Sequence, residues 1–475
     1  MHKKIIFLLL QLIIVNNIIT AQESSVYSRY GLGIMANHNN TATNMMGGLG
    51  TAYRSLEGQS YINPASLSAV SLVSFDIGIS GTFQNLKTTN LKAKQNSFNL
   101  DYLSIAVPVK KFWSMSAGLM PFSKKDYEVT KYNQLDSSSS YLLETNGNGS
   151  LNQVFWNNGF KIKDVSVGLG LGYIFGRIDN ISATTTQTNG IADLTSYTSY
   201  QKGTYKAKAL NVDLGVQYQL NLKNKKDTTS PYRMVFGFAV NTPFFLNGQQ
   251  YSNQLKSFYN EILVSRASDE TLSDFINDKV ENASYLQQFY SGKDWTTFAP
   301  DTFKTQTNHL SGMKAIPAYN IGIVFSRDYK FKVGIDFRYQ MWKNFKGFEQ
   351  NTTADLNNSW RIGIGGEILP NIKKYNKLFS KLKYRAGFYY SKTNISIRNN
   401  DINEFGIDFG VGIPMFNRFS SDEGFMQSYI TYPFNIGLQI GKRGTMADNL
   451  IQENFVRFRI GFSLNDKWFV KRKYY

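Results

Sequence analysis

The sequence predicts an all-β protein, a transmembrane antiparallel β-barrel of about 14 strands with an N-terminal lumen plug and a helical extracellular loop. Segments in which apolar residues alternate with small or polar ones recur along nearly the whole chain, as in strands with one face in lipid and one in a polar lumen. The chain starts with the pattern of an export signal. After that signal, no segment has the 18 or so consecutive apolar residues of a transmembrane helix.

Residues 1–21 are predicted to form a cleaved signal peptide. Lys3 and Lys4 precede an apolar run from Ile5 to Val15, and small residues end at Ala21, which is the order of regions in secretory signals. The alternative is a membrane anchor, but a spanning helix needs about 20 apolar residues, and the run from Ile5 to Val15 is shorter and is interrupted by Gln11. The chain has no cysteine, so neither a lipid-anchored N-terminus nor a disulfide framework is expected.

Residues 22–71 show no strand alternation and are predicted to form a plug inside the lumen. Gly47, Gly48 and Gly50 lie in a glycine-rich stretch, and the box Asn63-Pro64-Ala65 follows. Glycine allows tight turns that side chains would block. A segment of this length ahead of a barrel is expected to pack against the barrel rather than extend freely from it. The alternative is a disordered leader in which the glycines only form turns.

Residues 72–475 are predicted to form the barrel. The segments with strand alternation are 72–84, 96–108, 111–122, 152–162, 164–177, 203–221, 231–245, 314–326, 329–343, 355–368, 381–393, 402–413, 429–441 and 453–465. Each has the roughly 9 to 11 residues that cross a bilayer at a tilt. An even number of strands places both ends of the barrel in the periplasm.

The alternation also assigns residues to the two faces of the wall. Large apolar side chains are predicted to face lipid, namely Val167, Leu169, Leu171, Phe337 and Phe458, whereas Gly168, Asp336 and Arg457 face the lumen. Other lumen positions carry charges at Asp76, Asp213, Glu367, Asp408, Arg338, Arg361, Lys383, Arg385 and Arg459. These charges either form a track that guides a substrate or form ion pairs that fill the barrel and hold the plug. The second interpretation is favoured, because charges shielded from water need partners.

The connections are expected to alternate between short periplasmic turns and long extracellular loops. The turns are 109–110, 163 and 327–328, and the loops are 123–151, 178–202 and 246–313. The segments 369–380 and 414–428 are longer than periplasmic turns should be, which suggests a miscounted strand there.

The extracellular insert 246–313 is predicted to contain two helices that cap the barrel and bind a ligand or a partner. Apolar residues recur at helical spacing, and Ser268 is a suitable N-cap for the second helix. The predicted binding residues are Leu255, Phe258, Tyr259, Ile262, Leu263, Leu272, Phe275 and Ile276. A connection of this length is usually functional or disordered, and these stripes are too apolar for disorder.

The order of the glycine-rich stretch, the box Asn63-Pro64-Ala65 and fourteen strands resembles the FadL-like family of outer-membrane transporters of hydrophobic compounds. The resemblance implies a hatch inside the barrel and capture of hydrophobic ligands among the extracellular loops. Only Asn63, Pro64 and Ala65 match the family's box residue by residue. FadL-like barrels also include a type IX secretion protein, so the fold alone does not settle transport.

The chemistry of an enzyme is missing from the sequence. The three histidines are His2, His38 and His309, which with no cysteine makes a zinc site improbable, and no nucleophile-elbow pattern precedes His38 or His309. The net charge is +18, and the clusters of basic residues fall between the predicted strands. No basic helix and no aromatic RNA-binding pattern accompanies them. We therefore expect no catalysis, no metal, no cofactor and no nucleic-acid partner.

Three functions remain for a protein of the Gram-negative outer membrane surrounded by membrane lipids. The leading one is binding or transport of hydrophobic small molecules. The second is a non-transporting accessory subunit of an outer-membrane secretion or assembly complex, with other outer-membrane or periplasmic proteins as partners. The third is a general porin, which a plug of about fifty residues argues against.

Overall fold

A computed structural model describes most of the chain after the predicted signal peptide. The described residues are 25–56, 58–134, 137, 139–188, 191–192, 197–222, 232–258, 303–310, 316–327, 330–345, 354–370, 378–420 and 426–466. The predicted signal peptide 1–21 lies outside them.

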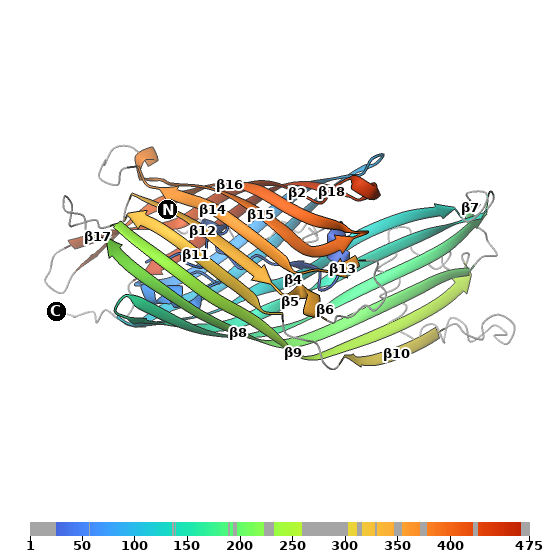
Figure 1. Ribbon diagram of the computed structural model, residues 1–475, viewed down its shortest axis with the longest axis horizontal. Coiled ribbons are helices and arrows are strands. Elements are labelled where there is room, and N and C mark those ends of the chain that lie inside the picture. Colours follow the sequence, from blue (N-terminus) through green and yellow to red (C-terminus); the bar gives the residue numbers. More distant parts are fainter. Residues whose placement is uncertain are drawn as a thin grey trace.

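Fourteen long strands form the wall of a closed antiparallel barrel (Figure 1). They are β2 (Val73–Lys87), β3 (Lys92–Lys110), β4 (Trp113–Gln134), β5 (Ser139–Ile162), β6 (Val165–Thr188), β8 (Tyr197–Leu222), β9 (Tyr232–Phe258), β11 (Ala318–Arg327), β12 (Phe331–Gln340), β14 (Ser359–Ile368), β15 (Lys383–Ile397), β16 (Asn400–Ser420), β17 (Met426–Arg443) and β18 (Gln452–Asp466). The barrel closes because β18 pairs with β2 and β9 pairs with β11. The predicted strand count is confirmed.

The first and last wall strands start and end at the same rim, since Val73 pairs with Asp466. We call this rim the near end and the opposite rim the far end. The two faces of the wall follow the predicted alternation. Leu169 and Phe337 are 44% and 41% exposed on the outer face. Asp336, which precedes Phe337 and points to the opposite side of the strand, is buried. The outer face is therefore suited to lipid, and the fold places the protein in the outer membrane.

The suspected strand miscount was wrong. After a register shift between Ile413 and Met415, β16 and β17 continue pairing as far as Ser420 and Met426. Most of 414–428 is therefore a hairpin that extends the two strands at the near end. Residues 369–382 connect β14 to β15 and include the short helix η5 (Leu378–Lys381).

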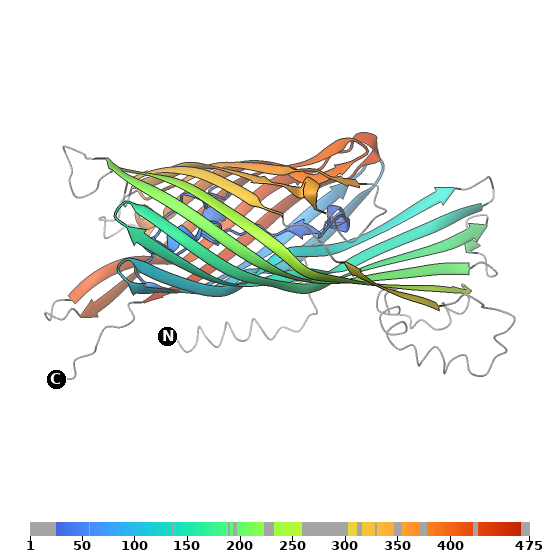
Figure 2. The same ribbon diagram turned by 60° about the horizontal axis from the view of Figure 1, so that its bottom comes forward.

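The loops predicted at 123–151 and 178–202 are largely strands. β4 and β5 remain paired as far as Gln134 and Ser140, and β6 and β8 as far as Thr185 and Thr198. With β9 these strands pass beyond the rest of the far end, as the teal to yellow-green ribbons of Figure 2 show. We call the part of β4, β5, β6, β8 and β9 beyond Asp126, Asn148, Asp179, Thr204 and Tyr251 the projecting sheet. These five residues are aligned across the sheet by register.

The predicted helical cap is not supported where it can be compared. Leu255 and Phe258 belong to β9, where Leu255 pairs with Tyr200 and Phe258 with Tyr197. On its other side, β9 pairs with β10 (Phe303–Leu310). Two flanking strands provide backbone hydrogen-bond partners, which override the helical spacing of the apolar residues. The remaining predicted cap residues, Tyr259, Ile262, Leu263, Leu272, Phe275 and Ile276, lie outside the described residues.

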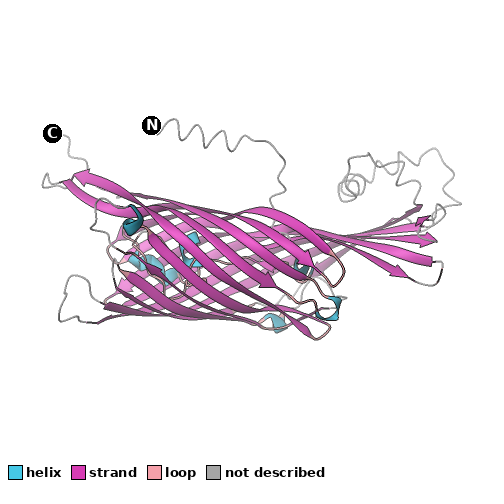
Figure 3. Ribbon diagram, turned by 90° about the horizontal axis from the view of Figure 1, so that it is seen from above, coloured by secondary structure: helices cyan, strands magenta, loops and turns pink. Residues whose placement is uncertain are grey.

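The segment ahead of the wall lies inside the barrel (Figures 2 and 3), and we call its described residues the plug. Its elements are η1 (Val26–Arg29), β1 (Ile34–Met35), α2 (Thr41–Asn44) and η2 (Pro64–Ala69). The other short elements are β7 (Ile191–Ala192), η4 (Trp342–Asn344), β13 (Ala354–Leu356) and η6 (Ala447–Asn449). Among the described residues, no helix is long and apolar enough to cross a membrane.

The wall strands β3 and β4 separate toward the far end. They pair between Leu103 and Lys110 of β3, but in the described chain the residues of β3 before Leu103 pair with β2 alone. The separation begins beside Pro121, where β4 also shifts register against β5. Proline has no N–H for the ladder and is confined to edges and bulges. Here β1 of the plug pairs with β4 at Ser123 and Lys124.

Candidate functional site

The box Asn63-Pro64-Ala65 fixes the plug to the wall. Asn63 caps η2 by accepting a hydrogen bond from the N–H of Ala65 at 3.0 Å, and Pro64 takes the first helical position, where its missing N–H costs nothing. The Asn63 amide donates to the carbonyl oxygens of Thr51 at 2.8 Å and, on β8, of Val216 at 3.3 Å. Asparagine is required because one side chain must both accept and donate.

Wall glycines leave room for the backbone and side chains of this box. A Cβ on Gly168 would lie 2.2 Å from the Ala65 nitrogen, and a Cβ on Gly215 would lie 2.0 Å from the Asn63 Oδ1. Gly237 meets the Thr51 carbonyl in the same way. The small residues on the lumen face of these strands thus mark where the plug rests.

The glycine-rich stretch forms the second attachment. Gly47 and Gly48 have φ values of +70° and +88°, a region that only glycine adopts readily. The turn brings the N–H groups of Gly50 and Thr51 to the Asp336 carboxylate of β12, at 2.7 and 2.6 Å. The predicted lumen position of Asp336 is therefore correct, and the residue grips the plug.

Several other lumen charges are paired as well. Arg385 contacts Glu367 at 2.7 Å, and Arg459 contacts Asp101 at 3.1 Å. Asp408 accepts a hydrogen bond from Gln439 at 2.7 Å. These contacts favour the interpretation that most lumen charges hold the barrel and plug together.

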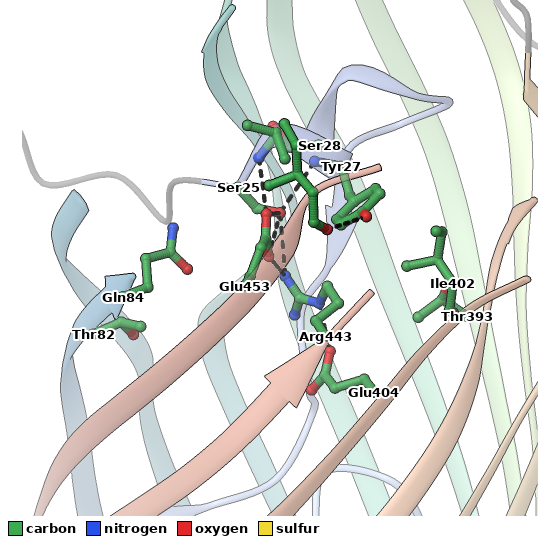
Figure 4. A network of polar contacts seen from close by, with 12 residues as sticks. Ser25, Tyr27, Ser28, Thr82, Gln84, Thr393, Ile402, Glu404, Arg443 and Glu453 are labelled. Atoms are coloured by element: carbon green, nitrogen blue, oxygen red, sulfur yellow. Dashed lines mark hydrogen bonds and ion pairs between the residues drawn. The ribbon is translucent and has the colours of Figure 1, made fainter. Parts of the chain in front are cut away.

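A third attachment lies near the far end, around η1 (Figure 4). The Ser25 hydroxyl donates to the Glu453 carboxylate at 2.7 Å, and Arg443 contacts Glu404 at 2.6 Å and Glu453 at 3.3 Å. The Tyr27 hydroxyl donates to the Ile451 carbonyl oxygen. The start of the described chain is thus joined to β16, β17 and β18.

A cavity of about 170 Å³ lies between the plug and the far half of the wall. Its lining includes six cationic side chains and two carboxylates: Lys124, Arg338, Arg361, Arg443, Arg457, Arg459, Asp101 and Glu404. Beside it, His38 of the plug has its pKa lowered to about 3, first by burial and second by the positive charge of Arg338. The lining also includes apolar and aromatic side chains such as Ile34, Trp342 and Trp360, so the cavity is mixed in polarity with an excess of positive charge.

The sequence singled out the residues of the attachments and, as lumen charges, Arg338, Arg361, Arg457 and Arg459 of the cavity, but it did not predict that these four surround one space. Gly47, Gly48, Gly50, Asn63, Pro64 and Ala65 lie together in the plug, as predicted. The arginines of the cavity come from β12, β14, β17 and β18, and only barrel closure brings these strands around one space. Among the described residues, no group of three or more histidines and carboxylates is placed to hold a metal.

Comparisons with known proteins agree on the fold. The chain resembles the crystal structure of a Pseudomonas aeruginosa FadL homologue, with a TM-score of 0.51, 12% identity, and coverage of 92% of this chain and 100% of that one. It also resembles the Ralstonia pickettii toluene transporter TbuX, with a TM-score of 0.50, 11% identity, and coverage of 90% and 99%. No curated protein sequence is similar to the chain.

At these identities the structural likeness establishes the barrel fold alone, and it confirms the resemblance to FadL-like barrels that the plug and strand count predicted. The model of one protein family, BamG, matches residues 1–475. The chain is therefore a FadL-like outer-membrane barrel that belongs to the BamG family.

Proposed function

We propose that this protein is a non-transporting accessory subunit of an outer-membrane assembly complex, which binds its partner through the projecting sheet. The observation that carries the proposal is the filled lumen. The plug is joined to the wall at Asn63, at Asp336 and at Glu453, which supports a lumen that is closed to a substrate.

The cavity also weighs against a hydrophobic cargo. A site for hydrophobic molecules is lined mainly by apolar and aromatic side chains, whereas this cavity contains six cationic ones. An apolar chain placed here would strip water from arginines without replacing their hydrogen bonds, which costs free energy.

The projecting sheet provides the contact surface. β9 continues from Thr242 to Phe258 beyond the last residue that pairs with β11, on the order of 50 Å at about 3.3 Å per residue, and its part after Tyr251 belongs to the projecting sheet. A strand extension of this length is not needed to cross a bilayer. In the described chain, β4 from Tyr127 onward pairs with β5 alone, and such an edge can accept a strand from another protein.

The test shortens this sheet without altering the barrel wall. Residues 127–147 and 180–203 are each replaced by Asn-Gly, which leaves the pairs Asp126–Asn148 and Asp179–Thr204 closed by two-residue hairpin turns. In the control, residues 88–91 between β2 and β3 are replaced by the same dipeptide. All three proteins are purified from outer membranes in mild detergent.

We expect the wild type and the control to retain the same outer-membrane or periplasmic proteins, and the shortened variant to lose them. Heat-modifiable migration in gels checks that each barrel has folded. Isolation of the wild type without a stoichiometric protein partner would refute the proposal, as would full retention by the shortened variant.

Transport of a hydrophobic small molecule is the second candidate. The separation of β3 and β4 favours it, since it leaves a lateral gap in the strand pairing where such a molecule could leave for the bilayer. Uptake of radiolabelled oleate and toluene by cells with and without the protein decides between the two. The accessory-subunit proposal expects equal uptake, and faster uptake with the protein would support transport.

A further inference from the structure

Two neighbouring arginines line the cavity, and in the described part of the chain neither forms an ion pair with a carboxylate. Arg338 of β12 and Arg361 of β14 are direct neighbours in register, and both line the cavity. In the described part of the chain, the Arg338 side chain forms no hydrogen bond or ion pair, and its Nε is fully buried. Arg361 reaches the Gly47 carbonyl at 3.5 Å and lies 3.6 Å from the centre of the Tyr389 ring. Neither contact is an ion pair.

This arrangement is unfavourable for the protein alone. Like charges directly opposite on neighbouring strands destabilise a sheet, and burial of a charge without a partner is costly. The two carboxylates of the cavity already serve other arginines, because Asp101 contacts Arg459 and Glu404 contacts Arg443. A negative charge from outside the chain would remove the repulsion between Arg338 and Arg361.

We propose that the cavity binds a phosphate monoester or inorganic phosphate between Arg338 and Arg361. Such a group carries a charge of about −1.5 to −2 at neutral pH. The planar guanidinium fork bonds phosphate oxygens in pairs, so two adjacent forks can hold one tetrahedral anion. A carboxylate, with a single charge, would compensate only one of the two arginines.

The space and the surrounding polar groups fit this ligand. One water molecule needs about 10–15 Å³ of such volume, so a cavity of about 170 Å³ has room for a phosphate and part of the molecule that bears it. Ser359, Ser391 and Asn37 also line the cavity and can donate further hydrogen bonds. The phosphate could belong to a lipid headgroup or be free in solution, and the binding experiment distinguishes these sources.

The experiment measures binding to the full-length protein in a non-ionic detergent without phosphate. The probes are inorganic phosphate and a short-chain phosphatidic acid, each titrated by calorimetry and followed by native mass spectrometry. We expect binding of at least one probe, weakened about tenfold or more in R338Q/R361Q, because hydrogen bonds to charged groups are lost. Tighter binding of phosphatidic acid identifies a headgroup site, whereas equal affinities identify a site for the free anion.

Two variant pairs serve as controls. R177Q/R327Q removes the same charge from positions outside the cavity lining and should bind both probes as the wild type does. R338K/R361K keeps the charge without the planar fork, and it should bind with intermediate affinity; it also carries the test if R338Q/R361Q fails to fold. The proposal is overturned if neither probe binds, if R338Q/R361Q binds like the wild type, or if the control pair loses as much affinity. This inference does not depend on whether the protein assembles with a partner.

Discussion

The near and far halves of the lumen are built from the same strands, yet the near half holds the plug and the far half surrounds a cavity. In the near half, glycines such as Gly168 and Gly237 leave room for the backbone of the plug, and the Asn63 amide bonds directly to the wall. In the far half, long arginine side chains surround a cavity. The near half holds the plug by direct contacts, whereas in the far half Arg338 and Arg361 lie side by side without an ion pair to a described carboxylate.

Polar residues in the lumen therefore differ in role, because some bond the plug and others do not. Asp336 is satisfied by the plug, with two N–H groups within 2.7 Å. Arg338, two residues further along β12, has no such partner among the described residues. The polarity of a lumen position therefore says little about its role until its partners are known, and the following predictions test the contrast between the two halves.

The largest effect is expected from removal of the plug. Deletion of residues 26–60 takes away η1, β1, α2 and the glycine turn but leaves all fourteen wall strands. In planar lipid bilayers we expect steady channels from the deletion variant and none from the wild type. If the variant conducts no better than the wild type, the plug does not close the lumen.

A methyl group at a wall glycine of the near half should be nearly as damaging. In Gly168→Ala the new Cβ would lie 2.2 Å from a backbone atom of the plug, so plug or strand must move, and we expect a loss of about 3 kcal/mol. Urea unfolding in detergent measures it. Gly203→Ala is the matched control, since its Cβ would meet nothing closer than 3.4 Å, and a similar loss there would contradict the packing argument.

Loss of the hydrogen bonds between Asp336 and the plug should lower the stability less than Gly168→Ala does, but by a measurable amount. Asp336→Asn keeps the shape of the side chain and removes the charge that two N–H groups bond, with an expected loss of about 1.5–3 kcal/mol. Asp179→Asn is the control, because its ion pair with Arg177 is largely at the surface and should contribute less than about 1 kcal/mol. Equal losses in the two variants would refute a specific role for Asp336.

The smallest effect should have the opposite sign. Without phosphate, Arg338→Gln removes the repulsion with Arg361 and should stabilise the barrel by about 0.2–1 kcal/mol. Added phosphate should then stabilise the wild type more than the variant. Thermal unfolding with and without phosphate measures both changes, and a destabilised variant in phosphate-free buffer would mean that Arg338 serves the fold itself.

The sequence by itself determined the wall and the plug. Alternation of apolar and small residues sets which face of a strand meets lipid, because successive side chains point to opposite sides, and Gly168 and Leu169 show the two outcomes. The positions of Gly47 and Asn63 were recognisable because turns and helix caps depend on neighbours in the chain. These features are local, so a single sequence contains them.

The tertiary structure alone decided the rest. Leu255 and Phe258 have helical spacing, but β8 pairs with both residues and β10 pairs with Leu255. The unmatched pair Arg338 and Arg361 exists because β12 and β14 meet in one register, and the cavity exists because the closed barrel brings β18 opposite these strands. Strand register and barrel closure are set by contacts between distant residues, which a local pattern does not encode.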